Sequence, residues 1–509
     1  MVSCPGPPHR SGQRCLIQRS HMKNALPALV LALFATLGNA TAATDWSETV
    51  PPKVAQADLA ALYDGLKSAH YNLFVHRSRA DYDARFAETM ADLRTPLTRF
   101  ELFLALQRFT AYGQVAHARI DFPTPVYAAY RENGGRAFPI YLRIVDGRAY
   151  VGEDYSGSDD VEPGDEILAI DGTPMAEWLT RTARTISADS PYIAHSLLES
   201  SFPRYLWVEL GERPHFTLRL RNDRGAVHEA RIAALTQTEL TKAIDQAPPV
   251  FELDFIARDA RMLTDSIGYL RPGPFYNVED PQRLWDASAF MAFVDSAFES
   301  FLEQDAQTLV IDLRNNPGGD NSFSDAMVRW IPDHPFRFAS RFLVRSSDEA
   351  AASNQARIDA NSGAAQGISA VYAKAFADTP RGETFPFEIP LAEPRDGKRF
   401  DGTVYVLVNR NSYSNAVNVA AIMQDYGWGI IAGEPTADYA TTYGAMERFT
   451  LPNSGFEVGF PKALIIRPSG DTRLGGVQPD LVIDTPIRPA DHDVVLDRLL
   501  ARISEGASR

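Results

Sequence analysis

The chain has 509 residues, of which 45% are hydrophobic and 23% are charged, a globular balance with room for more than one domain. Its formal net charge is −15 at pH 7, which argues against nucleic acid or an anionic membrane as a partner.

Residues 1–42 include the pattern of a leader. They hold no acidic residue and four basic ones: Arg10, Arg14, Arg19 and Lys23. Met22 and Lys23 precede an apolar run at 25–37 and then Ala40-Thr-Ala42, the pattern of a secretory signal peptide cleaved after Ala42. The run is too short to span a bilayer, and residues 1–21 resemble no part of a leader, so Met22 is the expected true start. Removing the leader takes the net charge to −19.

The cysteines exclude several kinds of site. Both of them, Cys4 and Cys15, precede Met22, so a mature chain has no disulfide, thiol nucleophile or thiolate metal site. No His-Glu-x-x-His motif occurs, and His70, His76 and His117 are too scattered to predict a metal site. We therefore expect no metal and no cofactor.

Residues 43–125 are expected to form a helical region. Apolar residues recur at helical spacing over 59–66 and again over 102–109. Thr98 followed by Glu101 has the spacing of a capping box, which predicts that a helix begins there.

Residues 136–236 are richer in strand patterns. Within them, residues 164–172 read Gly-Asp-Glu-Ile-Leu-Ala-Ile-Asp-Gly, which resembles a signature of PDZ domains, modules that bind a peptide by adding it as a strand. There is no clear Gly-Leu-Gly carboxylate loop, and residues 191–206 are expected to be an insertion. A β-rich module without a ligand therefore remains an equal alternative.

Residues 256–490 alternate strand and helix patterns, which predicts an α/β architecture. The most informative stretch, residues 308–319, reads Thr-Leu-Val-Ile-Asp-Leu-Arg-Asn-Asn-Pro-Gly-Gly. Its β-branched and apolar start predicts a buried strand. Pro317 then fixes a turn in which Gly318 and Gly319 can present free backbone N–H groups. Such groups at the end of a rigid strand suit an oxyanion hole, although an ordinary turn has the same composition.

A second strand is expected at 404–408, followed by a turn and a helix from Ser414 to about residue 423. Ser412 and Ser414 are both candidates for an ordinary helix cap. The start of a helix also favours developing negative charge, and the N–H of Asn415 is a candidate oxyanion donor there.

Four motifs follow in order over residues 265–485: the strand with Asn-Pro-Gly-Gly, Leu-Val-Asn-Arg-Asn-Ser-Tyr-Ser, Gly-Glu-Pro-Thr, and Gly-Val-Gln-Pro-Asp. Together they resemble the tail-specific (C-terminal processing) serine peptidases, a family that includes the tricorn core protease. The resemblance implies a crotonase-like ββα spiral as the catalytic domain, commonly preceded by a PDZ domain. It also implies that Ser414 is the nucleophile and that Gly318 and Asn415 supply the oxyanion hole. Val417 stands where the family usually has Glu.

The general base separates two branches of this family. One branch takes a lysine from the segment after Gly-Glu-x-Thr, but residues 433–444 contain none, and the nearest lysine is Lys462. The tricorn-like branch takes a histidine from the N-terminal region, which points to His117 at the end of the helix expected over 100–112. Val115 and Ala116 replace the Asp-Gly of that motif, so the assignment depends on position more than on identity.

A serine–histidine pair needs a third group to orient the imidazole. The tricorn-like branch uses a carboxylate shortly before the Gly-Val-x-Pro-Asp motif, where Asp471 is the nearest one here, about two residues out of register. Glu434 is the second candidate, with support of its own turn as the plainer interpretation.

The sequence thus predicts an exported serine endopeptidase, periplasmic or otherwise outside the cytoplasm, that cleaves a peptide or protein substrate through an acyl-enzyme. It is not expected to be an integral membrane protein. The alternative is a non-catalytic ligand- or peptide-binding protein on the same scaffold. Acyl-CoA chemistry, found in other crotonase-like proteins, is a weaker third possibility because no motif indicates a CoA site.

Overall fold

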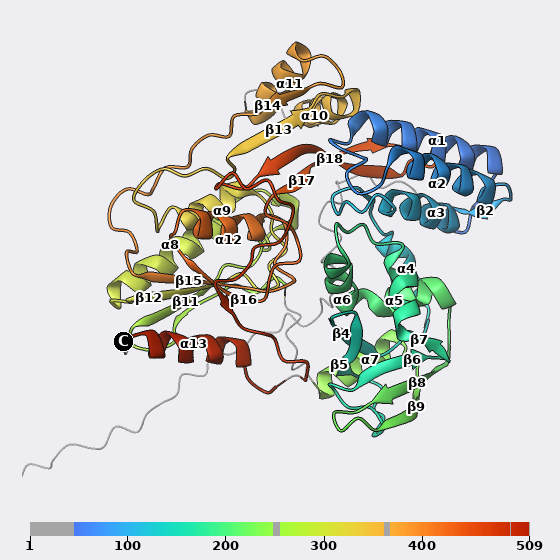
Figure 1. Ribbon diagram of the computed structural model, residues 1–509, viewed down its shortest axis with the longest axis horizontal. Coiled ribbons are helices and arrows are strands. Elements are labelled where there is room, and N and C mark those ends of the chain that lie inside the picture. Colours follow the sequence, from blue (N-terminus) through green and yellow to red (C-terminus); the bar gives the residue numbers. More distant parts are fainter. Residues whose placement is uncertain (1–44, 248–254, 361–366, 489, 508–509) are drawn as a thin grey trace, which may run out of the picture.

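The computed structural model describes residues 45–247, 255–360, 367–488 and 490–507 (Figure 1). The leader predicted for residues 1–42 lies outside the described residues.

The N-terminal region is helical, as predicted. It contains α1 (Pro52–Ala69), α2 (Arg79–Asp92), α3 (Arg99–Ala111) and α4 (Thr124–Glu132), with the short strands β1 (Thr49–Val50), β2 (Leu97–Thr98) and β3 (Arg119–Ile120). The capping box at Thr98 is confirmed, because its side chain accepts from the N–H of Glu101 and the Glu101 carboxylate accepts from the N–H of Thr98. A reciprocal cap of this kind fixes where α3 begins.

The middle region, residues 136–236, is built around an antiparallel sheet in the order β4-β5-β6-β8-β9. The strands are β4 (Ile140–Val145), β5 (Arg148–Asp154), β6 (Glu166–Ile170), β8 (His215–Arg221) and β9 (Val227–Ala233), with β7 (Thr173–Pro174) paired to β6. The helices are α5 (Met175–Ala183) and α6 (Pro191–Leu210), followed by α7 (Gln237–Gln246). The segment expected to be an insertion is thus the long helix α6, which packs on β4 with Leu198 and Phe202 in the core of this region.

A second sheet has the order β10-β11-β12-β15-β16-β19 and is parallel except for β10. Its strands are β10 (Asp259–Met262), β11 (Ile267–Arg271), β12 (Thr308–Asp312), β15 (Thr403–Val408), β16 (Ile430–Gly433) and β19 (Leu481–Val482). One face is covered by α8 (Ser288–Glu303), α9 (Asn321–Val328) and α12 (Asn415–Asp425), and α13 (Val494–Ala507) covers the other (Figure 1). Leu309 and Ile311 therefore face one core and Val310 the other, as the two-residue period of a strand requires.

A third sheet, in the order β14-β13-β18-β17, links the N-terminal region to residues 256–490, the expected catalytic part of the chain. It contains β13 (Arg341–Arg345), β14 (Thr384–Pro386), β17 (Thr442–Thr450) and β18 (Glu457–Ile466), beside α10 (Asp348–Ala360) and α11 (Ile368–Asp378). The short strand β3 pairs with β18, opposing Arg119 to Gly459 and Ile120 to Val458. The segment just before β3, which contains His117, is thereby held beside strands more than 300 residues later in the chain.

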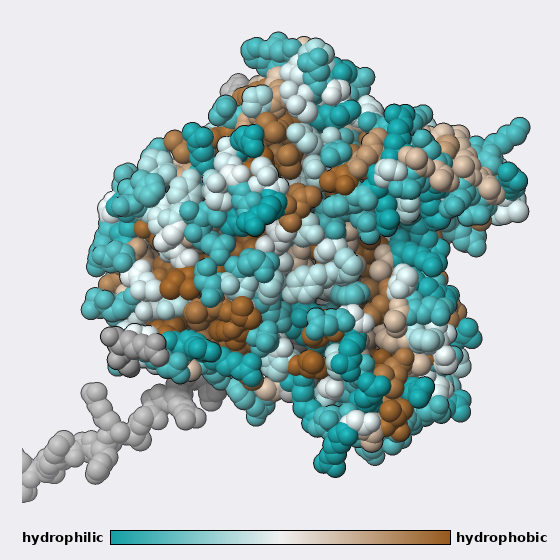
Figure 2. All heavy atoms as spheres, viewed as in Figure 1, coloured by the Kyte–Doolittle hydropathy of each residue, from teal (hydrophilic) through white to brown (hydrophobic). Residues whose placement is uncertain are grey.

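Hydrophilic residues predominate on the face shown in Figure 2, and hydrophobic ones gather there in several separate patches. Within the described residues, no helix combines the length and the apolar character needed to cross a membrane.

Candidate active site

Ser414 stands between β15 and α12 in a backbone conformation that side-chain-bearing residues rarely adopt. Its φ is 52° and its ψ is −121°, and its side chain makes no capping bond to the helix. The turn before it is tied to the end of β12, because the hydroxyl of Ser412 donates to the carbonyl of Leu313 at 2.8 Å. A strained residue held by a rigid turn costs roughly 1–3 kcal/mol and is typical of functional positions. The Ser414 hydroxyl itself donates no hydrogen bond to a described residue.

The glycine turn predicted from the sequence packs directly on Ser414. Gly318 has a φ of 84°, and a Cβ placed on it would lie 2.6 Å from the carbonyl oxygen of Tyr413 and 2.7 Å from the nitrogen of Asn415. No residue with a side chain fits so close to the backbone of Tyr413 and Asn415. The N–H of Gly318 donates to the side chain of Asn316 at 2.9 Å. The N–H groups of Gly319 and Asn415 donate to no described residue, and both residues line the same cavity as Ser414.

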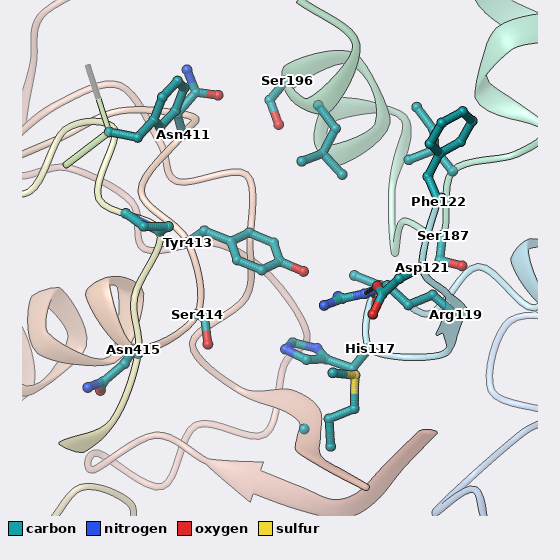
Figure 3. A pocket seen from close by; sticks show the side chains of 18 of the residues that line it. His117, Arg119, Asp121, Phe122, Ser187, Ser196, Asn411, Tyr413, Ser414 and Asn415 are labelled. Carbon is teal, nitrogen blue, oxygen red and sulfur yellow. Dashed lines mark hydrogen bonds and ion pairs between the residues drawn. The ribbon is translucent and has the colours of Figure 1, made fainter. Parts of the chain in front are cut away.

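His117 reaches that cavity from the N-terminal region. The N–H of Ala116 donates to the carboxylate of Asp189 at 2.8 Å, and the imidazole stacks on the ring of Tyr413 with centroids 6.0 Å apart. The imidazole of His117 and the hydroxyl of Ser414 point toward one another across the pocket (Figure 3). The Nδ1 atom of His117 is buried and has no hydrogen-bond partner within the described part of the chain.

A carboxylate that the sequence analysis missed lies beside this pair. Asp438 is fully buried, and its Oδ2 accepts from the N–H of Ser414 at 2.6 Å. Burial raises the pKa of Asp438, while the charge of His117 and the N–H groups of Ser414 and Tyr439 act to lower it. A buried carboxylate that interacts electrostatically with an imidazole can stabilise the imidazolium formed during catalysis. The sequence shows it only as an acidic residue two positions after Thr436, within residues 433–444, which contain no lysine.

The structure does not bring the two carboxylates named from the sequence to His117. The Asp471 carboxylate bonds to Arg473, which lowers its pKa to about 2, and neither residue lines the cavity. Glu434 is buried between Arg143 and Arg410 at 2.5 and 3.1 Å. Burial acts to raise the pKa of Glu434, but the charges of the two arginines outweigh it and lower the value to about 2.

Lys462, the nearest lysine by sequence, is also turned away from the site. Its ammonium is buried against the carboxylate of Glu447 at 2.5 Å and over the ring of Tyr372, and it does not line the cavity. Within the described ranges, no group of three His, Cys, Asp or Glu side chains is placed to hold a metal ion.

The cavity that contains Ser414 and His117 has a volume of about 1030 Å³. All three parts of the chain contribute to its wall, for example Phe103 from α3, Tyr141 and Leu197 from the middle region, and Ile465 from β18. This volume is at the upper end of ligand pockets, which suits a chain segment better than a small molecule.

The chain is similar to known proteins in sequence and in fold. The model of Peptidase family S41 matches residues 267–483. Two solved structures of mature CPAF, one of them complexed with lactacystin, cover 89% of this chain and 98% and 97% of their own, with TM-scores of 0.61 and 0.59 and 16% identity. The photosystem II D1 C-terminal processing protease covers 84% of this chain and 93% of its own, with 18% identity and a TM-score of 0.42.

At these identities the likeness to CPAF establishes a shared fold, and the family model carries the assignment. The matched segment contains the glycine turn, the strained Ser414 and the buried Asp438 described above. Residues 267–483 belong to peptidase family S41, and the chain is a serine-type peptidase.

Proposed function

We propose that this chain is an exported serine endopeptidase in which Ser414 is the nucleophile and His117 the general base. The observation that carries the proposal is the strained Ser414 facing His117 in one cavity of about 1030 Å³. A serine hydroxyl is a poor nucleophile at neutral pH, so it needs an adjacent base, and among the described residues no lysine lines this cavity.

The reaction follows from these positions. The Oγ atom of Ser414 attacks the carbonyl carbon of the scissile peptide bond while the imidazole of His117 takes the hydroxyl proton. The imidazolium then gives that proton to the leaving amine as the C–N bond breaks, which leaves an ester on Ser414. A water molecule, deprotonated by His117, hydrolyses the ester, and the proton returns to Ser414.

The N–H groups of Asn415 and Gly319 are the proposed donors to the oxyanion. Both line the cavity and donate to no described residue, whereas the N–H of Gly318 already donates to Asn316. Gly318 then acts by its small size, since it lets the turn lie against Ser414. Donors that are already oriented toward the developing charge account for a large part of the rate enhancement in such sites.

Asp438 is the proposed third member of the catalytic triad, beside Ser414 and His117 and in place of Asp471. Its burial and the effect of His117 on its pKa support this role. The hydrogen bond that it accepts from the N–H of Ser414 gives it a second task, since that bond helps to hold the strained serine backbone.

The proposal extends to the organisation of the domains and to the location of the protein. The parallel sheet with its covering helices fits a crotonase-like ββα spiral. The antiparallel sheet of residues 136–236 fits a PDZ-like module that presents substrate to the site. The leader pattern of residues 22–42 fits an extracytoplasmic location.

Peptide hydrolysis by three variants tests the proposal. We expect Ser414→Ala to abolish turnover and Asp438→Asn to lower kcat by about 10² to 10⁴. Asp471→Asn, a matched Asp-to-Asn control, is expected to retain activity. A normal rate for Asp438→Asn with a collapsed rate for Asp471→Asn would restore the assignment made from the sequence.

A further inference from the structure

One wall of the cavity beside Ser414 is formed by α9 and the start of α12, and it carries two buried oxygen atoms without partners. Asn415 is only 3% exposed, yet its Oδ1 makes no hydrogen bond within the described chain. The Oδ1 of Asp325 is likewise buried and without a partner. Both residues line the cavity. A buried acceptor without a donor costs about 1–3 kcal/mol, so two on one wall need an explanation.

The orientation of the Asn415 amide is fixed by its neighbour. The hydroxyl of Ser324 donates to the carbonyl of Asn321 at 3.3 Å, so it accepts from the Nδ2 of Asn415 at 2.9 Å. This bond uses the donor end of the amide. The acceptor end of the Asn415 amide is therefore the end left without a partner.

Asp325 forms no ion pair with a lysine or arginine in the described part of the chain. Its other oxygen, Oδ2, accepts from the amide of Asn321 at 3.2 Å. The guanidinium of Arg329, one turn later, donates to the carbonyl of Glu393. Burial raises the pKa of Asp325 to about 6, and the charge of Asp320 acts in the same direction, whereas the hydrogen bond from Asn321 and the charge of Arg329 act to lower it. Asp320 also lines the cavity, so this wall carries two carboxylates.

We infer that Asp325 and Asn415 form a specificity pocket for a basic side chain, lysine or arginine, of the peptide substrate close to the scissile bond. The inference rests on the proposed function, since Asn415 is the residue directly after the nucleophile. An ammonium or guanidinium group would donate to both free oxygens and neutralise the carboxylate. An aliphatic side chain would leave both unpaired, and an acidic one would be repelled. A buried carboxylate in a specificity pocket is a known way to select a basic residue.

Binding can be measured without turnover, on the Ser414→Ala variant. The probes are blocked hexapeptides of alanine with one central lysine, norleucine or glutamate, which are free to shift register along the cavity. We expect the lysine peptide to bind at least about tenfold more tightly than the norleucine peptide and the glutamate peptide to bind most weakly. In Ser414→Ala/Asp325→Asn the advantage of lysine should disappear, because the near-isosteric amide carries no charge.

The control is Ser414→Ala/Asp378→Asn, which removes an exposed carboxylate paired with Lys374 and corrects for general attraction to an acidic protein. It should keep the preference for lysine. Equal binding of the lysine and norleucine peptides to Ser414→Ala, or a lysine preference that survives Asp325→Asn, would overturn the pocket. A lysine preference in binding without hydrolysis by the wild type would support the pocket and contradict the proposed peptidase function.

Discussion

Replacing Glu434 with glutamine is expected to destabilise the protein strongly, because this carboxylate belongs to a buried ion cluster between two parts of the chain. Arg143 on β4 and Glu199 on α6 come from the middle region, and Arg410 and Glu434 from the catalytic part. All four side chains are at most 7% exposed. Glu434 accepts from both arginines, and Glu199 does so as well.

Glu434→Gln keeps the shape but removes one negative charge, which leaves two buried guanidinium groups with Glu199 alone. Breaking a buried ion pair from one side costs about 3–5 kcal/mol, because the remaining charge is uncompensated. The acid dependence has a defined sign. The pKa of Glu434 falls to about 2 in the folded state, below its value in an unfolded chain. The contribution of Glu434 to the free energy of unfolding is therefore complete above about pH 4.5 and is lost as the pH falls toward 2.

Urea unfolding at pH 7 measures this loss, and Glu162→Gln is the matched control. Glu162 pairs with Arg488 across the same two parts of the chain, but at 3.4 Å and with its side chain 68% exposed. Exposed pairs contribute about 0–1 kcal/mol, so the control should unfold nearly as the wild type does. Equal free energies of unfolding for the two variants would refute the view that this cluster fastens the middle region to the catalytic part.

Three further predictions concern acid, strain and the leader. Burial and, to a smaller extent, the charge of Arg345 lower the pKa of His70 to about 3. The contribution of His70 to the free energy of unfolding is therefore complete above about pH 6.5 and is lost as the pH falls toward 3. Between pH 7 and 5 the wild type should lose about 2 kcal/mol more free energy of unfolding than His70→Gln. An equal loss in both would show that another group controls the acid response. Because Ser414 has a φ of 52°, Ser414→Gly should unfold about 1 kcal/mol less readily than Ser414→Ala in the same titration; a glycine variant that is the less stable of the two would contradict the strain. N-terminal sequencing of exported protein should begin at Ala43, and an intact Met22 terminus in the cytoplasm would contradict export.

The local parts of the fold were predictable from the sequence, whereas the contacts between distant segments were not. The strand β12, the strand β15 and the helix α12 follow from short apolar patterns with clear turn residues, and the capping box marks the start of α3. The helix α6 leaves little signal in the sequence, because prolines at positions 191 and 203 and an apolar sequence without a polar face hide its helical period. Parallel pairing and the packing of β3 on β18 leave no local pattern.

The candidate site likewise has some residues that local motifs identify and others that only the folded structure brings together. Ser414 and Gly318 could be chosen from their motifs, because a tight turn and a serine after a strand are local features. Asp438, the proposed third member of the triad, could not be identified in this way, because its role depends on burial and on a histidine more than 300 residues away. Asp471 is the nearest carboxylate by position along the chain, but Arg473, two residues further on, binds it. Asp325 and Asn415 acquire meaning only when α9 and α12 pack together.

Covalent labelling by a fluorophosphonate probe tests whether His117 activates Ser414. We expect the wild type to be labelled at one site, which mass spectrometry of the digested protein locates to Ser414. Labelling should be absent in Ser414→Ala and slowed by at least about a hundredfold in His117→Ala, with unchanged circular dichroism as evidence of folding. Labelling of His117→Ala at the wild-type rate, or no labelling of folded wild-type protein at Ser414, would contradict it.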